Sequence, residues 1–352
     1  RFAAPPAPVF ALTPPGRPAH VFTYTPVDLT QDYAPPAAGL GTPQTSYQYN
    51  LDKQLSQITR PDGQTVTFAY DGAGRLSAQT TSSGVYGYGY NGVGKLAQIT
   101  APDSTLAYTY SGALLAQTAW SGPVSGTVGF GYDNDFRVAQ ITVNSQNPIA
   151  YQYDADSLLT QAGALILSRD AQNGLLTGTT LGGVSDSLSH TGFGEVSSYS
   201  ATANGAGVFA TTYTRDALGR ITQKVETIQG QATTYAYAYD VAGRLIEVKH
   251  NGATVATYGY DANGNRTQVN GQTIATYDDQ DRLLSYAGGA YTHTANGELK
   301  TRTVGGQTTS YDYDVLGNLR SVTLPDGKTI AYLIDGQDRR IGKKINGALT
   351  QG

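Results

Sequence analysis

The sequence contains no cysteine among its 352 residues, which excludes a disulfide framework, a thiolate metal site and a cysteine nucleophile. Charged side chains make up only 14% of the chain, well below the roughly 25% that is usual in soluble proteins. The net charge is −4 and the basic residues are scattered, so no basic stripe suggests nucleic-acid binding. No run approaches the roughly 18 apolar residues of a membrane-spanning helix.

Methionine is absent as well and the chain begins at Arg1, so we expect the sequence to be part of a longer, processed or excised polypeptide. Histidine is scarce, and its residues lack the close spacing of metal ligands. These residues are His20, His190, His250 and His293. No G-x-S-x-G or H-E-x-x-H hydrolase signature occurs. We therefore predict no catalytic, cofactor-binding or metal-binding residues, and a protein that is not an enzyme.

Glycine and tyrosine are abundant, with 43 and 26 residues, and they recur together in one motif. Its first clear copy is Tyr70-Asp71-Gly72-Ala73-Gly74-Arg75-Leu76. Clear copies also begin at Tyr90, Tyr239, Tyr260 and Tyr313, and looser copies at Tyr49, Tyr110, Tyr132, Tyr153, Arg169, His190, Arg215, Tyr277, His293 and Ile334. About fifteen copies at a spacing of roughly 16 to 25 residues predict a repeat architecture.

Each repeat is predicted to form a β-hairpin. In Thr65–Tyr70, large residues alternate with small ones, which is the period of a strand with one buried face. The Asp or Asn after the aromatic residue can accept a backbone hydrogen bond, and the glycine can adopt a positive φ, so the chain turns there. We expect positive φ at the glycines that share this turn position, which are Gly74, Gly94, Gly219, Gly243, Gly264, Gly297 and Gly317. Stacked hairpins would align their tyrosines into ladders.

The motif Tyr-Asp-x-x-Gly-Arg-Leu resembles the signature of the rearrangement-hotspot (RHS), or YD-repeat, family, which includes bacterial polymorphic-toxin shells and teneurin YD shells. The resemblance covers residues 45–352. It implies an all-β fold in which a long array of stacked hairpins spirals into a shell or barrel-like wall.

The first 44 residues differ from the rest because they hold most of the 15 prolines. Proline cannot donate to a strand ladder, so we predict a Pro-rich junction over residues 1–44 with one edge strand at His20–Tyr24. Residues 45–352 are predicted to be one repeat domain. The sequence ends just after the Asn346-Gly347 turn, which leaves a sheet edge bare, so we expect the domain to be truncated there.

Two patterns resemble ligand sites. Gly87–Gly92 matches G-x-G-x-x-G, but strands are predicted on both sides of it and no helix follows, so a repeat turn explains it better. Asp261, Asn263 and Asn265 have the spacing of calcium-loop ligands, and small acidic clusters occur at Asp133 and Asp135 and at Asp278, Asp279 and Asp281. The glycine and terminal glutamate of a calcium loop are missing, and an Asx turn already explains the first acid of each group. Trp120 suits either a core position or a glycan-stacking platform.

These observations predict a structural shell or fibre segment of a larger secreted or cell-surface bacterial protein. In the family's usual role it would encapsulate or carry a C-terminal effector. The alternative is a surface adhesin that binds a glycan or a cell-surface receptor, either alone or assembled into an extracellular filament. The expected partners are further segments of its own longer chain, such as an effector or anchor domain, and other copies joined through sheet edges. Nucleic acid and a membrane span are not expected.

Overall fold

The computed structural model describes residues 9–39 and 43–352, and within these residues the protein contains strands and turns but no helix. It follows that no described segment could cross a membrane as a helix. The 35 strands form two sheets, of 26 and nine strands.

The strands of the first sheet are β1 (Ala11–Leu12), β2 (His20–Tyr24), β3 (Thr30–Ala34), β4 (Thr45–Tyr49), β5 (Leu55–Thr59), β6 (Thr65–Tyr70), β7 (Leu76–Thr81), β8 (Gly84–Tyr90), β9 (Leu96–Thr100), β10 (Thr105–Ser111), β11 (Leu114–Ser121), β12 (Gly126–Tyr132), β13 (Val138–Val143), β14 (Gln146–Tyr153), β15 (Leu159–Ala162), β16 (Leu165–Arg169), β17 (Leu176–Leu181), β18 (Val184–His190), β19 (Val196–Ala203), β20 (Ala206–Arg215), β21 (Ile221–Ile228), β22 (Gln231–Tyr239), β23 (Leu245–His250), β24 (Ala253–Tyr260), β25 (Arg266–Val269) and β26 (Gln272–Thr273). The second sheet contains β27 (Ala275–Tyr277), β28 (Leu283–Tyr286), β29 (Gly289–His293), β30 (Leu299–Val304), β31 (Gln307–Tyr313), β32 (Leu319–Thr323), β33 (Thr329–Ile334), β34 (Arg340–Ile345) and β35 (Ala348–Gln351).

Every strand pairs antiparallel with its neighbours in the sequence, so each sheet is a meander. The pairings run without interruption from β1 to β26 and from β27 to β35. Among the described strands, the ladder is broken only between β26 and β27. The predicted array of stacked hairpins is confirmed.

The motif turn has the geometry of a hairpin loop with a bulge. The Gly74 amide donates to the carbonyl oxygen of Asp71, and the Asp71 amide donates to the carbonyl oxygen of Arg75. The register shifts between Ala69 and Tyr70, because the turn residue with positive φ adds one residue to its strand. All seven glycines predicted to have positive φ do so, with values from 76° at Gly74 to 98° at Gly297.

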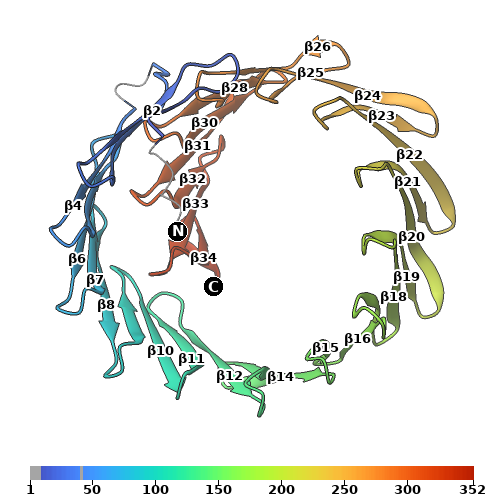
Figure 1. The fold of residues 1–352 in the computed structure, drawn as a ribbon, viewed down its shortest axis with the longest axis horizontal. Helices are drawn as coiled ribbons and strands as arrows, with labels where there is room; N and C mark the ends of the chain where they lie inside the picture. The colour runs from blue at the N-terminus through green and yellow to red at the C-terminus, as the bar shows by residue number, and fades with distance from the viewer. Residues whose placement is uncertain (1–8, 40–42) are drawn as a thin grey trace, which may run out of the picture.

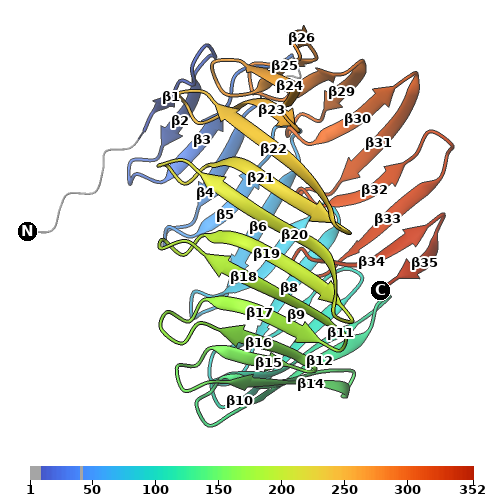
Figure 2. The ribbon, with the colours of Figure 1, turned by 90° about the vertical axis from the view of Figure 1, so that its right-hand side faces the viewer.

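The sheet bends into a ring that overlaps itself. Figure 1 shows β1 to β26 following almost a full circle, after which β28 to β34 run past β2 to β10 on the inner side. In the side view of Figure 2, these later strands are also displaced along the axis of the ring. We call β1 to β26 the first turn of the wall and β27 to β35 the second turn.

The N-terminal segment contains more regular structure than predicted. The expected strand at His20–Tyr24 is present as β2, but it pairs with β1 and β3 on its two sides and is not an edge strand. The prolines among the described residues of this segment lie between strands, where no ladder donor is needed, and β3 continues the sheet into β4. Tyr24–Thr30 even closes a motif turn, in which the Asp28 amide donates to the carbonyl oxygen of Thr25. Residues 1–8 lie outside the described part, and the domain boundary at residue 45 stays a prediction.

Candidate functional site

Two rims define the wall. The motif rim is formed by the motif turns, such as Asp71–Gly74 and Asp240–Gly243, and the far rim by the turns at the other ends of the hairpins, such as Arg60–Gly63 and Asn251–Gly252. Where the ring overlaps, the motif rim of the second turn lies on the far rim of the first. We call this contact the seam.

Within a turn of the wall, neighbouring repeats are joined by the motif tyrosine. The Tyr90 hydroxyl donates to the carbonyl oxygen of Leu76 at 2.9 Å, which lies at the end of the preceding motif. The same bond recurs at Tyr70, Tyr110, Tyr132, Tyr153, Tyr239 and Tyr260. The predicted tyrosine ladder is therefore also a ladder of hydroxyl-to-carbonyl hydrogen bonds that fixes the register of each repeat against the last.

Two loose copies of the motif carry arginine instead of the aromatic residue, and the guanidinium makes the same bond. Arg169 Nε donates to the Leu159 carbonyl oxygen at 3.0 Å, and an Arg215 terminal nitrogen donates to the Val196 carbonyl oxygen at 3.0 Å. This position therefore requires a long side chain that ends in a hydrogen-bond donor. The sequence showed these copies, but it did not show that arginine replaces the tyrosine hydroxyl.

The motif acid and cation form a second repeated contact. Asp71 Oδ1 accepts the amides of Ala73 and Arg75, and Oδ2 accepts Arg75 Nε at 2.8 Å. The side-chain hydrogen bond from Arg75 and the backbone bonds lower the pKa of Asp71. The Arg75 guanidinium then lies 4.3 Å from the ring centroid of Tyr90 in the next repeat, a cation–π contact. Arg137, Arg220 and Arg244 repeat this arrangement over Tyr153, Tyr239 and Tyr260.

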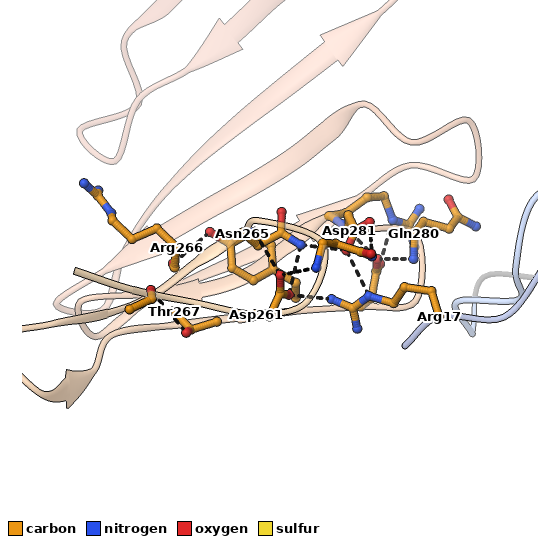
Figure 3. Close-up of polar contacts among 12 residues, drawn as sticks. Arg17, Asp261, Asn265, Arg266, Thr267, Gln280 and Asp281 are labelled. Atoms are coloured by element: carbon orange, nitrogen blue, oxygen red, sulfur yellow. Dashed lines mark hydrogen bonds and ion pairs between the residues drawn. The ribbon is translucent and has the colours of Figure 1, made fainter. Parts of the chain in front are cut away.

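We use the word fastening for a group of polar contacts that joins the two turns of the wall across the seam. Arg17 forms the first one (Figure 3). From the far-rim turn before β2, its guanidinium reaches Asp261 Oδ2 at 3.1 Å and Asp281 Oδ1 at 2.9 Å. These acids belong to motif turns on either side of the break between β26 and β27. Burial acts to raise the pKa of Asp281, but hydrogen bonds from Asn263, Asn265 and Arg17 hold it below its usual value. Arg17 thus bridges the two sheets where their ladder is interrupted.

The calcium-like spacing at Asp261, Asn263 and Asn265 is explained by the same contact. Asn263 and Asn265 donate their side-chain amides to Asp281, and Asp261 Oδ1 accepts two backbone amides. The carboxylates therefore face a guanidinium and amide donors. Of the other acids, Asp133 and Asp135 pair with Arg137, and Asp278 pairs with Arg282. Among the described residues, no group of three or more His, Asp or Glu side chains is arranged to hold a metal ion.

Arg60 forms the second fastening. It extends from the far-rim turn after β5 to Glu298 Oε1 at 2.5 Å and to the carbonyl oxygen of Val315. Glu298 occupies the motif position that holds a cation in many repeats. Glu195 holds the same position outside the seam and pairs with Arg215 of its own sheet, whereas the arginine that meets Glu298 comes from the other turn of the wall. Asn296 beside it donates to Asp62 Oδ2 at 2.8 Å.

Trp120 forms the third fastening. Its indole Nε1 donates to Asp335 Oδ2 at 3.1 Å, and the Arg339 guanidinium lies 5.4 Å from its ring centroid. Asp335 has no exposed surface. Burial acts to raise the pKa of Asp335, but hydrogen bonds from Arg339 and Trp120 hold it below its usual value. Arg339 therefore stacks on Trp120 in the same way as the motif cation within a sheet stacks on the tyrosine of the next repeat. Trp120 is half-buried at the seam, so it is neither a fully buried core residue nor an exposed platform, the two alternatives considered from the sequence.

The remaining sequence candidates lie in the wall. His190 and His293 occupy the motif aromatic position, His20 accepts or donates a 2.8 Å hydrogen bond with the Tyr33 hydroxyl, and His250 lies against Tyr235. The nucleotide-like pattern Gly87–Gly92 spans the end of β8 and a motif turn, with strands on both sides.

Comparisons with known proteins agree with this architecture. A sequence model described as Teneurin YD-shell matches residues 11–351. Teneurin-3 of Mus musculus is 33% identical over 139 residues, which are 37% of this chain and 5% of that protein. Toxin protein Tse5 of Pseudomonas aeruginosa is 29% identical over 140 residues, which are 37% of this chain and 10% of Tse5. The chain thus corresponds to a small part of these relatives.

Solved structures show the same fold. The Tc holotoxin pore of Photorhabdus luminescens aligns with 92% of this chain and 23% of its own at a TM-score of 0.61 and 14% identity. The TcdB2-TccC3-TEV structure aligns with 92% of this chain and 22% of its own at a TM-score of 0.58 and 13% identity. At such low identity these likenesses bear on the fold alone.

Proposed function

Because the chain belongs to the Teneurin YD-shell family, we propose that it forms one stretch of the wall of a larger secreted or cell-surface protein, and that this wall encloses a polypeptide carried further along the same chain. The role is structural. The observation that supports enclosure is the closure of the sheet on itself, with Arg17, Arg60 and Trp120 fastening the second turn to the first.

The position of the C-terminus supports the direction of packaging. In Figure 1 it lies within the outline of the ring, and in Figure 2 it lies toward one mouth of the ring. A polypeptide attached at Gly352 would therefore start inside the outline.

Protease access tests this proposal. A short unstructured tag with one protease site would be appended after Gly352, and the same tag would be inserted at the Asn251-Gly252 turn of the far rim as a control. We expect the terminal tag to be cleaved several-fold more slowly, because the wall restricts the approach of the protease.

Equal cleavage rates at the two positions would contradict enclosure. Opening the seam provides a second control, since Arg60→Ala should remove the contacts to Glu298 and Val315 and raise the cleavage rate of the terminal tag only. Circular dichroism on each tagged chain would verify that the strand content is unchanged.

A second candidate function, ligand binding by a surface module, is supported by one observation. A groove of about 720 Å³ on β1 to β5 is lined by Leu12, His20, Phe22, Tyr24, Thr30, Tyr33, Tyr47, Tyr49 and Leu55. Its stacked rings, such as Phe22 and Tyr33 with centroids 5.0 Å apart, suit the apolar faces of a saccharide. Neutral oligosaccharides should then quench tyrosine fluorescence in the parent chain and less so in Tyr33→Ala; no quenching in the parent would remove this candidate.

A further inference from the structure

Asparagine-glycine steps recur in the turns of this wall. In such a step the glycine has no Cβ to hinder its own backbone nitrogen. That nitrogen can attack the asparagine Cγ, so that a C–N bond forms, the Cγ–Nδ2 bond breaks, and Nδ2 leaves as ammonia with the glycine proton. Water then opens the five-membered succinimide ring to aspartate or isoaspartate. The asparagines that precede a glycine are Asn91, Asn173, Asn204, Asn251, Asn263, Asn270, Asn296 and Asn346.

Of these asparagines, Asn296 is the one whose side chain bonds across the seam. Its Nδ2 donates to Asp62 Oδ2 at 2.8 Å, and its Oδ1 accepts the backbone amide of Asp62 at 3.3 Å. Asp62 belongs to the far-rim turn after β5, whereas Asn296 belongs to the motif turn after β29. These bonds lie beside the pair between Arg60 and Glu298. A reaction at Asn296 therefore acts on the contact between the two turns of the wall.

The backbone after Asn296 leaves room for the reaction. Gly297 has a φ of 98°, and no atom of a more distant residue lies within 4 Å of the place where a Cβ would stand. The Gly297 amide donates to the carbonyl oxygen of Thr294 at 3.1 Å, compared with 2.9 Å for the same turn bond at Gly74 and Gly243. The nitrogen is thus held no more firmly than in other motif turns. The restraint comes from the side chain, because its two bonds to Asp62 restrict the rotation that brings Cγ onto this nitrogen.

The product would turn an attractive contact into a repulsive one. Aspartate or isoaspartate at position 296 has no N–H to donate, and its carboxylate would face the Asp62 carboxylate, to which Nδ2 now donates at 2.8 Å. Both carboxylates are charged at neutral pH. The nearby Arg60 is already engaged by Glu298 and the carbonyl oxygen of Val315. Isoaspartate also lengthens the backbone of the turn by one carbon.

We infer that Asn296 is a deamidation site that is coupled to the seam. The closed seam slows the reaction, because Asp62 holds the side chain, and the product loosens the seam, because two carboxylates then face each other. Since the ammonia is lost to solvent, the change is not reversed, and transient openings of the seam accumulate as a lasting loosening. This inference goes beyond the enclosing role and does not depend on it.

The rate of conversion tests the effect of the seam on the reaction. The folded parent, the Arg60→Ala variant and the parent unfolded in urea would be incubated at mildly alkaline pH, and conversion at each asparagine would be followed by peptide mass spectrometry. We expect Asn296 to convert several-fold faster in Arg60→Ala than in the folded parent, and fastest in the unfolded chain. The internal control is Asn251, which accepts the Thr234 amide outside the seam and should convert at the same rate in both folded proteins.

Variants with a fixed charge test the effect of the product on the seam. Asn296→Asp should accelerate amide hydrogen exchange in the turn Arg60–Gly63 several-fold, because the Asp62 amide bonds to Asn296 there. The matched control Asn251→Asp should leave this exchange unchanged. Combining Asn296→Asp with Asp62→Asn keeps one amide and one carboxylate in the pair with their places exchanged. This double variant should return the exchange to near the parent rate.

Three results would overturn the inference. If Asn296 stays unconverted in both folded proteins while the unfolded chain converts, the site does not exist. Equal conversion rates in the parent and in Arg60→Ala would remove the coupling to the seam. Unchanged exchange in Asn296→Asp, or a double variant that is as loosened as the single one, would show that the contact with Asp62 does not hold the seam.

Discussion

The single-layer wall from β12 to β24 and the overlapped wall around the seam are built from the same repeat but differ in what is buried. In residues 126–260, which are all described, only Gly178 and Thr211 are buried. In the overlapped part, Val66, Tyr86, Ile99, Leu106, Val315, Val322 and Asp335 are all buried. The hydroxyl ladder and the motif turns are present in both parts. The repeat alone therefore makes a continuous sheet, and a closed core forms only where one turn of the wall covers another.

The buried carboxylate of the seam should be the most sensitive position. Asp335→Ala removes the acceptor of Trp120 and Arg339 and the turn bonds to Gln337 and Arg339, which we expect to cost about 4 kcal/mol of unfolding free energy. The same change at Asp240, in the single-layer wall, should cost much less because its side chain is 19% exposed. Chemical denaturation of both variants measures the difference, and equal losses would contradict the distinction between the two parts.

Apolar truncation should follow the same order with a smaller effect. Leu106→Ala is expected to destabilise the overlapped wall by about 3 kcal/mol, since it leaves a cavity beneath the second turn. Ile149→Ala, at the equivalent position of the single-layer wall, should cost about 1 kcal/mol because much of its side chain is already exposed. Hydrogen exchange would locate the loss: the Leu106 variant should also expose amides of β32 and β33, whereas protection lost only within β10 would argue against coupling across the seam.

The hydroxyl ladder should not distinguish the two parts. Tyr110→Phe and Tyr153→Phe each remove one hydroxyl-to-carbonyl bond of 2.8 Å, the first in the overlapped wall and the second outside it. Each should cost about 1 kcal/mol. Thermal melts of the two variants measured side by side test this, and a clearly larger loss at Tyr110 would show that the ladder depends on the overlap.

The smallest expected effect is on pH dependence. Burial lowers the pKa of His293, with a further contribution from the Arg282 charge, while Asp278 opposes them. The unfolded chain therefore binds a proton more readily than the folded chain as pH falls below about 6.5, so stability should decrease there. His293→Tyr should remove this part of the acid sensitivity, as measured by melts between neutral and mildly acidic pH. As a control, His190→Tyr alters the same motif position outside the seam. An equal loss of acid sensitivity in that variant would contradict the assignment of the effect to His293.

Much of the fold could be predicted because it is local. The spacing of the motif, the alternation within Thr65–Tyr70 and the turn glycines depend on residues close in the sequence, and the structure confirms the positive φ at all seven predicted positions. The motif turn at Tyr24–Thr30 was missed because Thr25 and Asp28 stand where the motif usually has its acid and its glycine. Its signal was the tyrosine that ends a strand of alternating residues.

The seam could not be predicted because it depends on how curvature accumulates over the ring. Arg60 lies 238 residues from Glu298, and Trp120 lies 215 residues from Asp335. A small change in the angle between successive hairpins would bring other turns opposite these residues. No local pattern in the sequence indicates the value of that angle. The charge reversal at Glu298 was visible in the sequence, but its meaning required the position of Arg60.

The meander also determines the order in which the protein can be built. Because each strand pairs with the strand made just before it, the wall can grow from its N-terminal end as the chain emerges from a ribosome or a secretion channel. The hydrogen bond from Trp120 to Asp335 cannot form until Asp335, which is 215 residues later in the chain, has been made. This fastening can therefore form as soon as β33 and its motif turn have been made, and a polypeptide attached after Gly352 would emerge later, into a wall whose seam can already close.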